Sequence, residues 1–414
     1  MVVKPRPAVG LERAPSLPDR WRLVRFDQMA ECVTDRVDNP AEAGVERYVG
    51  LEHLDPESLR IRRWGSPTDV EATKLCFKPG DIIFGRRRAY QHKLAVADFE
   101  GICSAHAMVL RAREDVVIKE FLPLLMQSDL FFDRALAISV GSLSPTINWR
   151  TLARQEFPLP PKEEQRRIAE ILWAADETTQ CYIRAQQHAE LSVRLTSDSI
   201  LKRLYDSRES DAYPSKELAA YFERSPESGH SAVASSVDTG FYVLTLTALG
   251  PNGYERGNFK PVGVSPKSEA ARLRKGDFLI SRSNTRDLVG FAGIFDEDAE
   301  NVTFSDLMMR LHIREVELDK RFLQLLLLSS RGRAHIMSVA AGTSASMKKI
   351  NRRGLGKFVV VCPPKSVQLS VVETVQELRR PVVSLTQHIK STRALLKALL
   401  NQLLGGCAGD IQRS

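Results

Sequence analysis

Pro160-Pro161-Lys162-Glu163-Glu164-Gln165 is a junction that the chain repeats 203 positions later as Pro363-Pro364-Lys365-Ser366-Val367-Gln368. Beyond each Pro-Pro pair the sequence takes a helical period for roughly forty residues, far more than the ~11–12 residues of an average globular helix. A helix of that length needs a partner to bury its apolar side. The junctions therefore predict two long helices, at 162–205 and 365–404, that pair with each other.

Apolar residues in the second helical segment recur at alternating spacings of four and three, the a/d pattern of a coiled coil. They are Val371, Val375, Leu378, Val382, Leu385, Ile389, Thr392 (the one polar position), Leu396, Leu399 and Leu403. The positions 203 residues earlier form a softer seam in the same phase: Ile168, Leu172, Ala175, Thr179, Tyr182, Gln186, Ala189, Val193, Thr196 and Ile200. We expect the two stripes to pair antiparallel, with a kink near Arg380 because Pro381 interrupts the second stripe.

The sequence before each junction is also repeated. Lys78-Pro-Gly-Asp81 leads into Ile82-Ile83-Phe84-Gly85-Arg86, as Arg274-Lys-Gly-Asp277 leads into Phe278-Leu279-Ile280-Ser281-Arg282. The offset between matched motifs changes only from 196 to 203 along the chain, so small loop insertions within one duplicated unit explain it. Each copy is typical of short strands, including 106–113 and 307–314, followed by a helix near 118–139 or 319–340.

We therefore predict an α+β fold with two tandem mixed α/β domains, an internal pseudo-twofold repeat, and two long helices that pair as an antiparallel coiled coil. The expected boundaries are a disordered tail at 1–16, a first domain at 17–161, a central helix at 162–205, a linker at 206–214, a second domain at 215–364, a C-terminal helix at 365–404 and a tail at 405–414.

Length, charge and hydrophobic content limit the kinds of protein that this chain can be. The 414 residues suit two or three domains at about 150 residues each. The 59 Lys and Arg exceed the 51 Asp and Glu, and the net charge of +8 favours a polyanionic partner. No stretch approaches the ~18 apolar residues of a membrane span, and the N-terminus lacks the apolar core of a signal peptide. We expect a cytoplasmic protein with no membrane partner.

Motifs of catalysis and of metal binding are absent from the sequence. No phosphate-binding P-loop, glycine-rich dinucleotide or adenosylmethionine loop, zinc-protease motif or nucleophile elbow occurs. The six cysteines are scattered, and none lies at metal-ligand spacing from a histidine. We expect no catalytic centre, no metal site, and reduced, mostly buried thiols.

With catalytic and metal motifs absent, the candidate functional residues are binding residues, and they lie in two loops of each domain. In the first domain a basic segment with an aromatic residue directly follows a strand, where it can face phosphates and base edges, and a hydroxyl-rich loop precedes the junction. The candidate DNA-binding residues there are Arg86, Arg87, Arg88, Tyr90, Lys93, Ser142, Ser144 and Asn148. Their counterparts in the second domain are Arg282, Ser283, Asn284, Arg286, Thr343, Ser344, Lys348 and Lys349. A solvated charged loop and ordinary helix capping are the alternative interpretations.

Two variable domains that each end in a Gly-Ser/Thr loop, Pro-Pro-Lys, a following Gln and a long helix resemble the specificity subunit of type I restriction-modification systems. The first junction, Phe157 to Ile168, carries the stronger signature. The second departs from it, because Ser366 and Val367 replace both acidic residues and put local contacts at that helix end in doubt. The resemblance extends from about Leu17 to Leu404.

The resemblance implies that each domain is a target-recognition domain that reads one half of a bipartite double-stranded DNA sequence. It implies that the long helices set the spacer and dock methyltransferase (modification) subunits, expected to number two, and that restriction/translocase subunits join the complex. Adenosylmethionine, ATP and Mg are then expected in partner subunits, with no cofactor in this chain.

Two other classes stay open at this point. A coiled-coil adaptor that binds proteins alone would also have the seam, but it would not need arginine and amide side chains at the same place in both domains. A catalytic methyltransferase would need an adenosylmethionine pocket, for which the sequence offers no loop.

Overall fold

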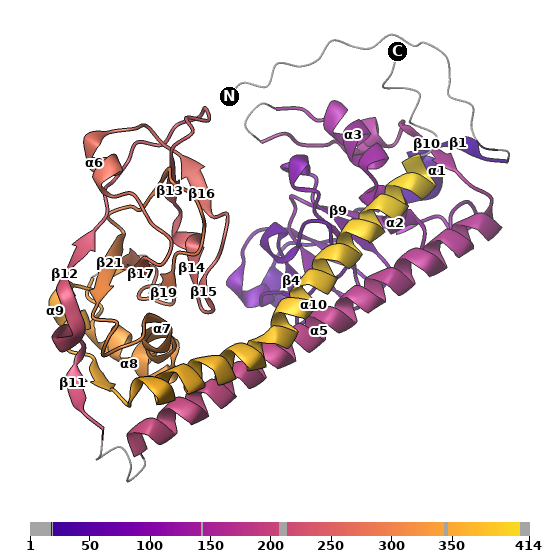
Figure 1. The fold of residues 1–414 in the computed structure, drawn as a ribbon. Coiled ribbons are helices and arrows are strands. Elements are labelled where there is room, and N and C mark those ends of the chain that lie inside the picture. Colours follow the sequence, from indigo (N-terminus) through magenta and orange to yellow (C-terminus); the bar gives the residue numbers. More distant parts are fainter. Residues whose placement is uncertain (1–17, 19, 142–143, 207–212, 343–346, 406–414) are drawn as a thin grey trace. The chain divides into compact units, whose positions relative to one another are not determined.

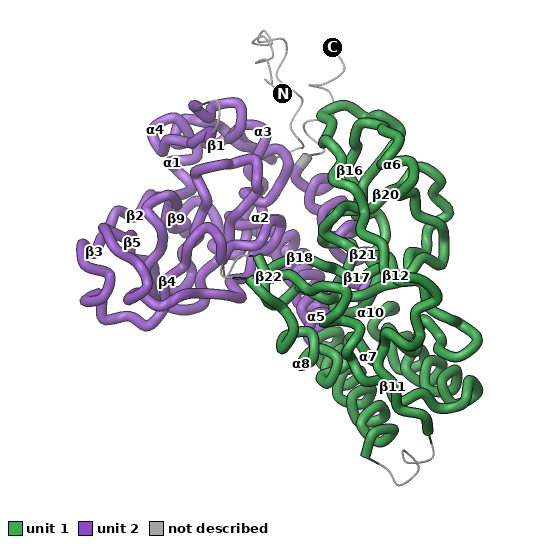
Figure 2. The backbone as a smooth tube through the Cα atoms, turned by 90° about the vertical axis from the view of Figure 1, so that its left-hand side faces the viewer, with its two compact units in different colours: residues 1–5, 185–385 green, residues 6–184, 386–414 purple. Residues whose placement is uncertain are grey.

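Figure 1 shows the computed structural model of the chain, which describes residues 18, 20–141, 144–206, 213–342 and 347–405. The expected tail at 1–16 and most of the expected linker at 206–214 and tail at 405–414 lie outside these ranges. The chain divides into two compact units (Figure 2): unit 2 holds residues 6–184 and 386–414, and unit 1 holds residues 1–5 and 185–385. Each unit combines one globular domain with half of each long helix; unit 2 holds the first domain, and unit 1 the second.

The first domain is built on two four-stranded sheets. One is antiparallel throughout, in the order β2 (Ala30–Val33), β9 (Met108–Ala112), β6 (Ile82–Phe84) and β7 (Leu94–Val96). The other has the order β3 (Arg36–Val37), β5 (Lys74–Phe77), β8 (Gly101–Cys103) and β4 (Tyr48–Val49), with β4 and β8 parallel. A separate antiparallel pair joins β1 (Arg22–Arg25) to β10 (Glu156–Leu159), the two ends of the domain.

The second domain repeats this topology. Its main sheet is again antiparallel, in the order β12 (Phe222–Ser228), β21 (Met308–Ile313), β17 (Phe278–Ser281) and β19 (Ala292–Ile294). A second sheet has the order β16 (Phe259–Pro261), β13 (Tyr242–Leu244) and β20 (Val302–Thr303), with β13 and β20 parallel. The remaining pairs are β11 (Ser215–Glu217) with β23 (Val359–Val361), β14 (Leu249–Gly250) with β15 (Gly253–Tyr254), and β18 (Ser283–Asn284) with β22 (Lys348–Lys349). The predicted α+β fold with an internal repeat is confirmed.

The same turn leads into the central strand of each main sheet. Gly80 and Gly276 both have a φ of +92°, which residues with a Cβ atom rarely adopt. Asp81 and Asp277 each accept, through Oδ2, the backbone amide three residues earlier at 2.9 Å. The repeated Gly-Asp motif therefore fixes where β6 and β17 begin.

The predicted helices at 118–139 and 319–340 are wrong as single helices, because each is two. The helices are α2 (Leu122–Gln127), α3 (Asp129–Ala137), α7 (Lys320–Leu328) and α8 (Ser330–Val339). The breaks fall at Ser128 and Ser329, whose backbones are extended and whose side chains accept the amide three residues further on. Each serine thus caps a new helix in a new direction.

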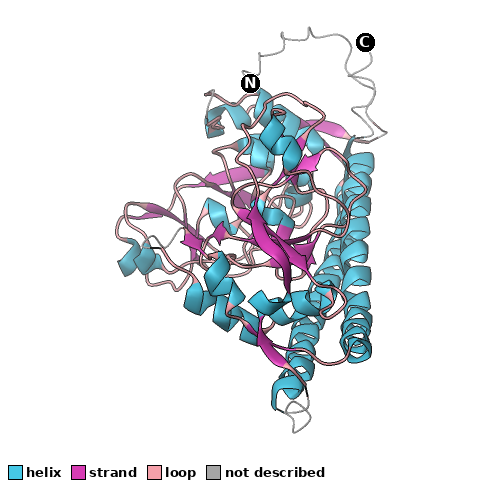
Figure 3. Ribbon diagram, turned by 60° about the vertical axis from the view of Figure 1, so that its left-hand side comes forward, coloured by secondary structure: helices cyan, strands magenta, loops and turns pink. Residues whose placement is uncertain are grey.

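Short helices complete both domains, and two long helices support them (Figure 3). The other short helices are α1 (Phe26–Met29), α4 (Trp149–Leu152), α6 (Pro266–Ala270) and α9 (Arg352–Gly356). The long helices are α5 (Lys162–Asp206) and α10 (Lys365–Gly405). Within the described ranges, no helix combines the length and the apolar character that crossing a membrane requires.

The long helices pack together in antiparallel directions, as predicted. In unit 2 Leu172 of α5 and Leu400 of α10 belong to one core, and the Tyr182 and His388 rings stack at 5.4 Å. In unit 1 Leu201 of α5 shares a core with Val375 of α10. All predicted seam positions of α10 are buried or half-buried, and on α5 only Thr196 is exposed. The helix continues through Pro381, and the kink expected beside it stays a prediction.

The cysteines only partly follow the prediction of mostly buried thiols. Cys103 and Cys362 are buried, Cys32 and Cys76 are half-buried, and Cys181 is exposed. Cys181 lies on α5 between the seam positions Thr179 and Tyr182, on the side of the helix that faces solvent. These five cysteines of the described ranges are free thiols, and Cys407 lies outside those ranges.

Candidate nucleic-acid interface

The two segments of the first domain that were predicted separately lie side by side. The backbone amide of Ile147 donates to the carbonyl of Arg86 at 3.0 Å, and the amide of Arg88 donates to the carbonyl of Pro145 at 2.8 Å. Arg87 and Thr146 form an antiparallel bridge between them. The basic segment after β6 and the hydroxyl-rich loop before α4 therefore form one continuous surface.

The second domain builds the same arrangement. Strand β18, directly after the central strand, pairs with β22, so that Ser283 lies opposite Lys349. The amide of Ile350 donates to the carbonyl of Arg282 at 2.9 Å, as its counterpart Ile147 does to Arg86. Two loops far apart in sequence thus meet at equivalent places in both domains.

Exposed groups of the first domain fit a nucleic-acid surface. Arg87 is exposed, and its Nε donates to the Ser144 hydroxyl at 3.0 Å while its Nη1 lies 3.1 Å from Nε2 of His106. Burial, and then the charge of Arg87, lower the pKa of His106, so its neutral ring can accept from the guanidinium. Arg88 is exposed, and Tyr90 is 53% exposed. Sequence reasoning missed His106, which lies in a different loop.

Other predicted residues have partners inside the fold. The Lys93 ammonium donates to the carbonyl of Leu51 at 2.7 Å. Asn284 is only 7% exposed, and its Oδ1 accepts the amide of Thr285 at 2.9 Å. Lys348 donates to the carbonyl of Gly342 at 2.6 Å. Ser283 differs, because it is buried and its hydroxyl has no hydrogen-bond partner among the described residues, so burial alone keeps it from DNA. Lys93, Asn284 and Lys348 would have to give up internal contacts to reach DNA.

The remaining candidate residues differ in how exposed their side chains are. Asn148 and Lys349 are exposed, as is Arg286, so their side chains face solvent. Arg282 is half-buried, and its Nη1 donates to the carbonyl of Asp306 at 3.3 Å. The candidates Ser142, Thr343 and Ser344 lie outside the described residues.

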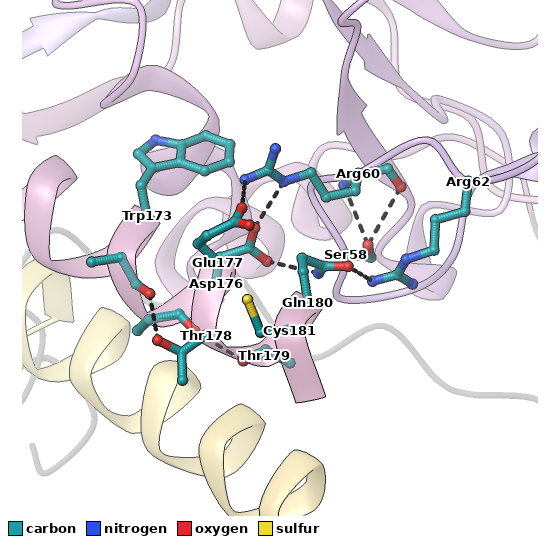
Figure 4. A network of polar contacts seen from close by, with 12 residues as sticks. Ser58, Arg60, Arg62, Trp173, Asp176, Glu177, Thr178, Thr179, Gln180 and Cys181 are labelled. Carbon is teal, nitrogen blue, oxygen red and sulfur yellow. Dashed lines mark hydrogen bonds and ion pairs between the residues drawn. The ribbon is translucent and has the colours of Figure 1, made fainter. Parts of the chain in front are cut away.

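A polar network holds the first domain on α5 (Figure 4). Arg60 donates from Nε to the buried Asp176 at 2.9 Å and from Nη2 to Glu177 at 3.3 Å. Its guanidinium lies 5.0 Å from the Trp173 ring centroid, a distance at which a cation is attracted to the ring. The helix therefore fixes the domain that presents the basic loop.

The chemistry of the side chains in these loops is that of binding. In the part of the chain that the structure describes, no three His, Cys, Asp or Glu side chains gather closely enough to hold a metal ion. The surface offers cations, hydroxyls and an aromatic ring, which is the chemistry of binding to phosphates and bases.

The chain is similar to known proteins of type I restriction systems. Residues 68–191 match the family model described as the type I restriction modification DNA specificity domain. The type I restriction enzyme EcoDI specificity subunit of Escherichia coli is 31% identical over 173 residues, which are 39% of this chain and 37% of that relative. The chain thus spans just over a third of the length of that relative, and 26% of the EcoEI specificity subunit.

Longer matches have lower identity. The EcoKI specificity subunit of Escherichia coli strain K12 is 21% identical over 378 residues, covering 85% of this chain and 76% of that protein. A solved chain from work on complex assembly and conformational transition of the type I R-M system has a TM-score of 0.53 at 20% identity, covering 95% of this chain and 98% of that one. The chain is therefore similar to the specificity subunits of type I restriction enzymes over part of its length, and the solved chain at 20% identity has the same fold.

Proposed function

We propose that this chain is the DNA sequence-recognition subunit of a type I restriction-modification complex, with each domain reading one half of a bipartite site. The observation that carries this proposal is the repeated pairing of two loops beside Arg86 in one domain and Arg282 in the other. A protein adaptor has no need for a cationic surface at the same topological position twice. Phosphate contacts from such a surface position DNA, and base contacts give sequence specificity.

The long helices are proposed to set the spacer between the half-sites and to dock the modification subunits. Large aliphatic side chains remain exposed on them, and such groups favour a protein partner. They are Ile171, Leu191 and Leu195 on α5, and Val383 and Leu395 on α10.

The chain is proposed to be non-catalytic by itself. Adenosylmethionine would be bound by two modification subunits that methylate adenine, and ATP and Mg by restriction/translocase subunits. In this division of labour, the chain's own residues bind DNA and partner subunits and carry out no bond-making step.

A domain exchange tests the proposal. Residues 17–161 are replaced by the equivalent domain of a relative, the chain is co-expressed with its modification subunit, and methylated adenines are mapped across a genome. One half of the recognised sequence should change and the other should persist. Exchange of residues 215–364 is the matched control and should change the opposite half. If both halves changed in either variant, the domains would read DNA jointly and the proposal would be wrong.

A further inference from the structure

A pocket of 240 Å³ opens beside Arg86 in the first domain. It lies among β2, β3, β5 and the start of β9, so its walls come from both four-stranded sheets. Three cations line it: Arg36, Lys74 and Arg86. No Asp or Glu is among its described lining residues.

The three cations lack acidic partners. Considering only the residues that the structure describes, none of them forms an ion pair, and the nearby carboxylates of Glu31 and Asp81 bind Arg111 instead. Lys74 is only 8% exposed, and its ammonium is held by backbone carbonyls, including that of Ala72 at 2.8 Å. Arg36 is exposed and Arg86 is half-buried, so both can meet an incoming anion, and Lys74 adds positive charge to the same pocket.

Arg86 contributes a donor that has no acceptor. Its Nε is buried and makes no hydrogen bond to any described residue. Burial raises the pKa of the neighbouring Cys32 thiol, while the charges of Arg86 and Arg36 act on that thiol in the opposite direction. Arg36, Arg86 and Cys32 all line the same pocket.

The second domain differs at the equivalent place. There one donor of the Arg282 guanidinium, Nη1, is taken by the carbonyl of Asp306 at 3.3 Å. Direct reading of a base edge relies on directional donor and acceptor pairs. Three cations converging on one pocket match a negative charge rather than such a pattern.

We propose that this pocket binds one backbone phosphate of DNA, and that Arg86, with Arg36 and Lys74, anchors the phosphate instead of reading a base. The inference rests on the proposed function, because it takes DNA as the ligand. It assigns the first domain a sequence-independent contact that the second domain makes differently or lacks.

A salt series on the full-length chain, assembled with its modification subunits, gives the first test. Binding is measured to cognate DNA and to DNA with both half-sites scrambled. Arg86→Ala and Arg36→Ala should each weaken binding to both DNAs by a similar factor, roughly tenfold at low salt. Each should lower the slope of log K against log salt by about one, the value for one phosphate contact.

Lys119→Ala is the matched control. Lys119 is an exposed cation of the same domain that lies beyond the other end of β9, outside the pocket. Its removal should leave the slope unchanged. A loss in Arg86→Ala confined to cognate DNA would instead make Arg86 a base reader and overturn the proposal.

Neutral phosphate analogues give the second test. Single methylphosphonates are placed along the half-site that the first domain reads. One position should weaken wild-type binding but cause no further loss in Arg86→Ala, because the same contact cannot be lost twice. If every position weakens both proteins equally, no phosphate occupies the pocket.

Wild-type protein without any salt-dependent DNA binding would contradict the proposed function itself. Normal binding with an unchanged slope in both arginine variants would contradict only the pocket. The variants could also bind DNA normally but, without DNA, be less stable than the wild type in inorganic phosphate. That result would assign the pocket to free phosphate and would overturn the proposal.

Discussion

A buried glutamine at the start of each long helix joins that helix to its domain. Gln165 is 1% exposed; its Oε1 accepts the amide of Ile118 at 2.9 Å, and its Nε2 donates to the carbonyl of Pro160 at 2.9 Å. Gln165→Leu should lower the free energy of unfolding by about 1–3 kcal/mol for each polar group left unpaired. Urea unfolding measures the change. Gln187→Leu, at an exposed position of the same helix, is the control and should stay within about 0.5 kcal/mol.

We expect His92 to make the stability of the first domain depend on pH. Its ring stacks on Phe132 at 4.0 Å, and burial, followed by the charge of Lys397, lowers its pKa below the ordinary 6.5. The folded state then keeps His92 neutral at a pH where the unfolded state already binds a proton. Stability should therefore fall as the pH drops below about 6.5. The melting temperature, measured between pH 7.5 and 5.5, should decline less in His92→Asn, and an identical decline would exclude His92 as a source.

The residues of the candidate site were only partly predictable. The sequence showed the basic segment at Arg86 and the hydroxyl-rich loop near Ser144, because each is a local cluster of one chemistry. It could not show that they touch, since backbone pairing between them depends on the tertiary fold. Arg36, Lys74 and His106 were missed for the same reason: each is a single polar residue on a separate strand or loop, with no local pattern around it.

At the scale of elements, the helices broken by serine show where periodicity misleads. Apolar residues continue on both sides of Ser128, so the pattern predicts one helix. The structure has two, because the Ser128 hydroxyl accepts the amide of Phe131 at 3.3 Å and donates to the carbonyl of Leu125 at 2.6 Å. Ser329 repeats the contact in the second domain. The long helices were predictable because their seams extend over many turns and no residue of this kind caps a new direction within them.

Loss of the serine cap should be measurable. Ser128→Ala removes the acceptor for the first turn of α3 and should destabilise the chain by about 1 kcal/mol, the usual effect of losing an N-cap. Ser199→Ala on the exposed surface of α5 is the matched control. Chemical unfolding of both variants tests this, and equal stabilities would mean that packing of α3, not the cap, determines the break.

At the scale of the whole molecule, each domain is bound by the long helix that follows the other domain. In unit 2 the amide of Asp129 donates to Oδ1 of Asn401 on α10 at 3.1 Å. In unit 1 the amide of Ser330 donates to Oδ1 of Asp198 on α5 at 2.9 Å. Asp198 and Asn401 are 203 residues apart, the offset of the repeated junctions. The two halves of the chain thus exchange one contact, as two subunits of a symmetric dimer would.

This exchange predicts that a fragment of residues 1–206 can pair with itself. Its α5 would take the place of α10, and Asp198 of one copy would meet Asp129 of the other. In the intact chain the amide of Asn401 donates to the Asp129 carboxylate at 2.7 Å, whereas an aspartate there adds like-charge repulsion. The fragment with Asp198→Asn should therefore dimerise about tenfold more tightly than the unsubstituted fragment, by roughly 1.4 kcal/mol.

Sedimentation equilibrium measures both dimerisation constants after circular dichroism has verified folding. A fragment of residues 1–184, without the second half of α5, is the control that should stay monomeric. Equal affinities would show that the helix seam alone, without this polar contact, holds the halves together.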